Sequence, residues 1–133
     1  NIALDNHYQE RVLYVDNEIM INNFPVLQIN HNIDINDNNI DLIIKDIDYC
    51  MNNLDNNKLY ILLFNFDEMD HNVSIIRLKK IIKHAEINYM YLLHKCIIYN
   101  YTNSWKMILD IVLTFLCKST KEKICLRQNI NIN

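Results

Sequence analysis

Four side chains that could hold a divalent cation follow the most apolar stretch of the chain. They are Asp67, Glu68, Asp70 and His71, directly after residues 59–66, which read LYILLFNF. Carboxylate oxygens and imidazole nitrogens are common ligands of divalent metals, and α/β proteins bind ligands where strands end. The same residues also suit a turn that leads into a helix, since acidic side chains are stabilising near a helix N-terminus. We favour the turn and predict no catalytic site, no metal and no cofactor.

The remaining reactive side chains are scattered. The five histidines show no ligand spacing among themselves, and the four cysteines lie far apart with no CxxC pair. Such spacing favours reduced thiols over a zinc site or a disulfide framework, so we expect a cytoplasmic protein. The chain has no glycine, which excludes a glycine-rich phosphate loop. Turns that need a positive φ must then use asparagine, and the pairs at 22–23, 38–39, 52–53 and 56–57 are the natural places.

The hydrophobic patterning predicts elements that would position these residues. We expect strands at 11–16, 25–30, 59–66, 95–100 and 124–126, helices at 37–54, 72–85 and 104–117, and a short helical turn at 86–93. Asp70 or Asn72 would cap the second helix. Strands that alternate with helices imply crossover connections and a parallel sheet. The predicted fold class is α/β, a single layer of largely parallel sheet with helices packed on it, in one domain over residues 1–133.

The ordered set of segments resembles the CRAL-TRIO (Sec14-like) lipid-binding domain over roughly residues 12–127. The segments that carry the likeness are 14–16 with 24–27, 59–69, 81–93, 96–101, 105–116 and 120–124. Asn65 and Glu68 stand where the family usually has Asp and Gly. Residues 89–92 lie where the family has a Tyr-Pro-Glu-Arg-type corner, and they contain neither the Pro nor the Arg of that corner. A short match of this kind, over roughly residues 12–127, is most similar to the BCH subgroup of the family.

The resemblance implies that helix 104–117 is a gate over a buried lipid, phosphoinositides being one class. Taken alone, the broad apolar stripe of this helix is explained first as ordinary core, which is the default for such a stripe. With the family likeness, the expected wall residues are Phe66, Tyr99, Trp105, Ile108, Ile111, Val112 and Phe115. Trp105 would lie at the mouth, where its N–H could reach water or a head group.

Charge is divided unequally along the chain. Residues 1–71 carry 3 basic and 13 acidic side chains, whereas residues 72–133 carry 10 basic and 3 acidic ones. Two oppositely charged faces of one fold explain this division. A basic face that meets anionic head groups at a membrane surface is the alternative, with Lys79, Lys80 and Lys83 as its candidates. We predict no nucleic-acid partner, because the sequence pI is near 5.9 and no recognisable module is present.

Two functions follow from these expectations. The first is non-enzymatic binding of a lipid or another hydrophobic small molecule in a cavity between the sheet and the gate helix, with peripheral attachment to membranes. The second, which the BCH likeness implies, is a domain without a pocket that forms a homodimer or binds a partner of the small GTPase type.

Overall fold

The computed structural model describes residues 11–30, 33–66 and 74–128. In these ranges the chain forms β1 (Leu13–Ile21), β2 (Phe24–Ile29), α2 (Ile40–Asn52), β3 (Tyr60–Asn65), α3 (Ile75–Tyr89), the 3₁₀ turn η2 (Met90–Leu92), β4 (Leu93–Tyr99), α4 (Asn103–Leu113), α5 (Lys118–Lys121) and β5 (Ile124–Arg127). The tails, residues 31–32 and residues 67–73 lie outside the described part, as do the predicted caps Asp70 and Asn72.

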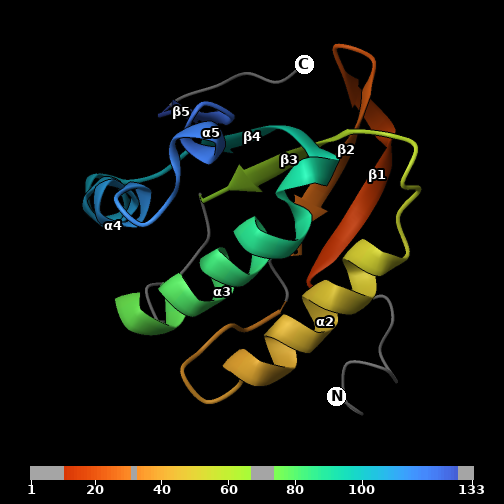
Figure 1. Cartoon of the computed structure of the whole chain (residues 1–133). Helices are drawn as coiled ribbons and strands as arrows, with labels where there is room; N and C mark the ends of the chain where they lie inside the picture. Colours follow the sequence, from red (N-terminus) through yellow and green to blue (C-terminus); the bar gives the residue numbers. More distant parts are fainter. Residues whose placement is uncertain (1–10, 31–32, 67–73, 129–133) are drawn as a thin grey trace.

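One five-stranded sheet in the order β1-β2-β3-β4-β5 organises the chain. β1 is antiparallel to β2, and every later neighbour is parallel. Figure 1 shows α2 and α3 side by side in front of the sheet, with α4 beyond α3 near the β5 end. The α/β class predicted from the patterning is therefore confirmed.

Residues of one register row define the face of the sheet that the helices cover. Leu27, Leu62, Cys96 and Ile124 are paired in sequence from β2 to β5. Leu27 packs with α2, and Cys96 packs with α4. Because successive side chains of a strand point to opposite faces, their neighbours form a separate cluster on the other side of the sheet. Val26, Ile61, Leu63 and Ile97 are the buried members of that cluster.

The turn chemistry of asparagine is visible in the hairpin. Asn22 and Asn23, which join β1 to β2, have φ values of 51° and 70°. Positive φ at both central residues is the requirement of the tight turn that best matches strand twist. Asn100, after β4, has a φ of 59°. The 22–23 turn was predicted, whereas Asn100 was not.

Helix boundaries differ most from the predicted ones in α3 and α4, while α2 is shorter than predicted at both ends. α3 begins after Ser74, whose hydroxyl accepts from the Arg77 backbone N–H at 3.4 Å, and it continues to Tyr89. α4 ends at Leu113 instead of residue 117. The Thr114 hydroxyl donates to the Ile111 carbonyl at 2.6 Å, and the next backbone bonds span three residues. This tighter turn ends the regular helical face before Phe115, whereas Leu116 remains buried as the pattern predicted.

Candidate ligand cavity

An apolar cavity of about 380 Å³ lies between the helix-covered face of the sheet and helices α2, α3 and α4. Its floor includes Leu62, Phe64, Cys96 and Ile98 of β3 and β4. Pockets for small molecules in proteins usually measure ~300–1,000 Å³ and have mainly apolar walls. The cavity therefore has the size and chemistry of a site for a compact hydrophobic molecule.

Helix α4 forms one part of the helical wall of the cavity, beside α2 and α3. Its N-terminus is fixed by Thr102, whose hydroxyl accepts from the Trp105 backbone N–H at 3.2 Å. The Trp105 side chain is 7% exposed and lies edge-on to Phe66, with 4.6 Å between ring centroids. Trp105 and Val112 are both buried and both line the cavity. The helix thus presents aromatic and branched side chains to the hollow space.

Four of the seven predicted wall residues line this cavity. Phe66, Trp105, Ile108 and Val112 come from the end of β3 and from one face of α4. The structure brings them together as the spacing of the stripe predicts, because positions 105, 108 and 112 follow helical periodicity. Whether they contact a ligand stays a prediction.

The other three predicted wall residues lie elsewhere. Tyr99 belongs to the cluster on the opposite face of the sheet. Ile111 is 43% exposed, since it lies on the outer side of α4. Phe115 follows the tight turn that ends α4, and its ring lies 4.7 Å from the Lys79 ammonium. None of the three is among the residues that line the cavity, so the predicted wall is corrected at these positions.

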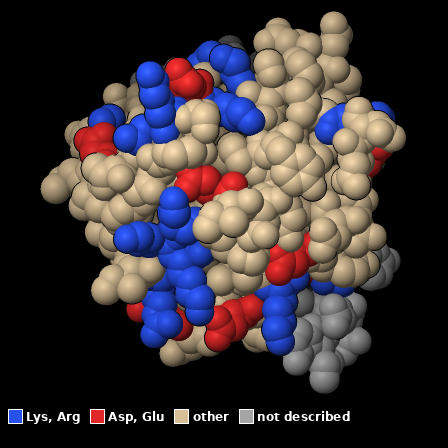
Figure 2. Space-filling model, viewed as in Figure 1, with Lys and Arg blue, Asp and Glu red and all other residues tan. Residues whose placement is uncertain are grey.

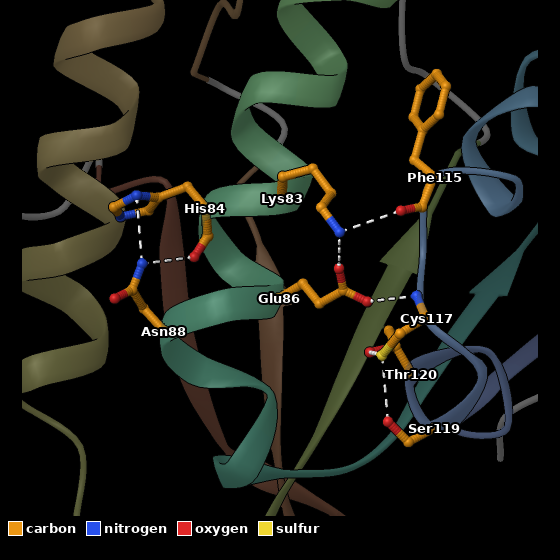
Figure 3. A network of polar contacts seen from close by, with 8 residues as sticks. All are labelled: Lys83, His84, Glu86, Asn88, Phe115, Cys117, Ser119 and Thr120. Carbon is orange, nitrogen blue, oxygen red and sulfur yellow. Dashed lines mark hydrogen bonds and ion pairs between the residues drawn. The ribbon is translucent and has the colours of Figure 1, made fainter.

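Glu86 of α3 forms a polar edge of the cavity that the sequence reasoning missed (Figure 3). One carboxylate oxygen is paired with the Lys83 ammonium, and the other accepts from the Cys117 backbone N–H at 2.9 Å. Lys83 also donates to the Phe115 carbonyl at 3.1 Å. These bonds tie α3 to the segment between α4 and α5. The available signal was spacing, because Glu86 lies four residues after the apolar Ile82 on the same helical face.

Glu86 is ionised despite its burial. Its side chain is 7% exposed, and burial alone would raise the pKa of the carboxyl. Hydrogen bonds from Lys83, Thr120 and Cys117 outweigh burial and lower the pKa of Glu86 to about 2. Thr120 is itself 1% exposed and lines the cavity. This edge of the cavity therefore carries a negative charge, which hydrogen bonds and an ion pair within the protein stabilise.

The three lysines predicted for an anionic surface each contact another part of the protein. Lys80 donates to Asp41 of α2 at 3.0 Å, Lys83 is paired with Glu86, and Lys79 lies over the Phe115 ring. In Figure 2, basic and acidic side chains alternate over the helices of the visible face. This arrangement agrees with two attracting faces of one fold, and membrane contact stays a prediction.

Two carboxylates of α2, Asp46 and Asp48, bond it to neighbouring parts of the fold. The buried Asp46 accepts from Arg11 at 2.5 Å and from the Val12 backbone N–H at 2.7 Å. Asp48 bonds His84 of α3 at 2.6 Å, and it also accepts from the Tyr89 hydroxyl. Burial and the hydrogen bond to Asp48 raise the pKa of Tyr89. α2 is thereby joined to the start of β1 and to α3.

The acidic cluster considered first in the sequence, Asp67, Glu68, Asp70 and His71, lies outside the described residues. Within the described ranges, no group of three His, Cys, Asp or Glu side chains is arranged to hold a metal ion. No helix in those ranges is long and apolar enough to cross a membrane.

Comparisons with known proteins agree with the fold. A family model described as the CRAL/TRIO domain matches residues 9–132. The crystal structure of Sfh5 is similar to this chain with a TM-score of 0.60 and 16% sequence identity. The match covers 96% of this chain and 49% of that one, so this chain spans about half the length of its structural neighbour. A search of curated proteins gives no match.

Proposed function

We propose that this chain, which belongs to the CRAL/TRIO domain family, binds a lipid or another hydrophobic small molecule without catalysing a reaction on it. The family is one of lipid-binding domains, and the chain has the family fold. The observation that carries the proposal is the cavity of about 380 Å³ between the sheet and helices α2, α3 and α4. Its position between the sheet and helix α4 matches the place that the resemblance assigns to the ligand.

Partition from water into this cavity provides the binding energy. Each CH₂ group that leaves water for an apolar environment contributes about 0.8 kcal/mol. A short alkyl chain that fills the space between Leu62 and Val112 would therefore gain several kcal/mol, and part of this gain is offset by lost motional freedom. An affinity of 1 μM corresponds to about 8 kcal/mol, so it requires the burial of more than ~10 CH₂ groups if no specific polar contact contributes.

The cavity also counts against the pocket-less alternative. A protein-interaction domain of the BCH type, acting as a homodimer or through a small GTPase-type partner, was expected to have a filled core. The hollow between α4 and the sheet is the opposite of that expectation. We therefore favour the small-molecule ligand.

Two measurements test the proposal. Mass spectrometry of an organic extract of the purified protein should reveal a co-purified hydrophobic molecule. Protein stripped of that molecule should take up the neutral dye Nile red saturably, with displacement by unlabelled lipid. An extract without any such molecule, together with dye uptake that never saturates, would disprove the proposed function.

A further inference from the structure

The charged side chains that line the cavity share one sign. Among the described lining residues they are Asp34, which is exposed, and Glu86, whose side chain is buried. Asp34 lies in the loop before α2, and Glu86 lies on α3 near the segment that follows α4. The described lining residues include no Lys, Arg or His, so they offer an ionised acid group no cationic partner.

The cation paired with Glu86 is Lys83. Lys83 neutralises Glu86 and donates to the Phe115 carbonyl, and its side chain is not among those that line the cavity. The Glu86 carboxylate, in turn, is held by hydrogen bonds from Lys83, Thr120 and Cys117. An acid group placed inside the cavity would therefore lose its hydration without gaining an ion-pair partner from these residues, which is strongly unfavourable.

From this arrangement we propose that the cavity selects uncharged hydrophobic molecules, such as long-chain alcohols or compact ring systems, over lipid anions. The inference rests on the proposed function and adds the ligand class to it. The volume limits the size of the ligand, because 380 Å³ lies near the lower end of the usual range for ligand pockets. A single chain or a small ring system suits this space.

The test compares two molecules that differ only at one end. Dodecanol and dodecanoate compete with Nile red for the full chain at pH 8, where the acid is ionised. We expect dodecanol to displace the dye at a concentration about tenfold or more below that of dodecanoate, which corresponds to ~1.4 kcal/mol or more. Equal potency would overturn the selectivity. If Nile red never binds, the proposed function itself fails, and the selectivity fails with it.

Two variants locate the cause of the selectivity. Glu86→Gln removes the buried charge and should narrow the gap between the two competitors, whereas Glu122→Gln, at an exposed position, should leave it unchanged. Ile108→Lys places a cation in the wall and should increase dodecanoate affinity at least tenfold by calorimetry. Met107→Lys, on the exposed side of the same helix, is its control. If a wall variant does not fold, the comparison of the two competitors on the unaltered chain remains decisive.

Discussion

Replacing Val112 by phenylalanine should distinguish a hollow core from a filled one. Val112 is buried on the inner face of α4 and lines the cavity. In a densely packed core, a larger side chain costs about 1–3 kcal/mol, because neighbours must leave their preferred rotamers. Beside a space of about 380 Å³, the added ring has room without moving them. The two situations predict effects of opposite sign.

The expected magnitude follows from the extra apolar surface that becomes buried. The larger side chain adds on the order of 50 Å², which at ~25 cal/mol per Å² stabilises the fold by about 1 kcal/mol. The same ring occupies part of the ligand's volume, so hydrophobic ligands should bind roughly tenfold more weakly, a change of ~1.4 kcal/mol. Higher stability together with weaker binding is the expected result.

Urea unfolding and Nile red titration measure these two quantities on one preparation. Ile111→Phe is the matched control, since residue 111 is the adjacent position on the outer side of α4. It should change neither quantity by more than a few tenths of a kcal/mol. A Val112→Phe protein that is destabilised by 1 kcal/mol or more, with unchanged dye affinity, would refute the view that α4 covers a hollow.

Three further predictions concern stability. Asp46→Ala should lower the free energy of unfolding in urea by about 2–4 kcal/mol, because the buried Asp46 carboxylate accepts from both Arg11 and the Val12 backbone N–H. Asp41→Ala, at an exposed position, should leave the urea midpoint nearly unchanged. Asn22→Gly should stabilise the hairpin, whereas Asn22→Val should destabilise it by ~1–2 kcal/mol, since a β-branched residue tolerates positive φ poorly; thermal unfolding of both variants decides. Because folding lowers the pKa of Glu86 from 4.5 to about 2, its stabilising contribution is complete above pH 4.5 and is lost as pH falls toward 2. As pH is lowered from 4.5 toward 2, the urea midpoint of Glu86→Gln should fall less steeply than that of Glu122→Gln. Equal dependence of the two midpoints on pH would contradict a lowered pKa of Glu86 in the folded protein.

Local patterns were enough to predict the sheet and most of the helices. Residues 59–66 are almost continuously apolar because β3 is covered on both faces, and the periodicity of 37–54 corresponds to the buried side of α2. The turn at 22–23 followed from the absence of glycine. These features depend on residues that are close in sequence, so local patterns were enough to predict them.

The cavity wall was only partly predictable, since it depends on tertiary geometry. Tyr99 alternates with Ile98 along β4, and the sequence alone does not tell which of the two faces the helices. Phe115 leaves the α4 stripe because the chain tightens after Ile111, through a hydroxyl bond that no periodicity reveals. Glu86 was missed because its partners, Cys117 and Thr120, lie more than 30 residues away in the chain. The local spacing places Glu86 on the face of Ile82, but it does not reveal these long-range contacts.

The location of the ligand can be tested most directly through Trp105, the single tryptophan of the chain, which lines the cavity. A long-chain alcohol that carries bromine near its middle quenches a tryptophan only when the two are in contact. The result expected of a ligand in this cavity is saturable quenching at one ligand per chain, with half-saturation at roughly tenfold higher ligand concentration in Val112→Phe but not in Ile111→Phe. Quenching that rises linearly with concentration, or that is equal in both variants, would contradict a ligand site in this cavity.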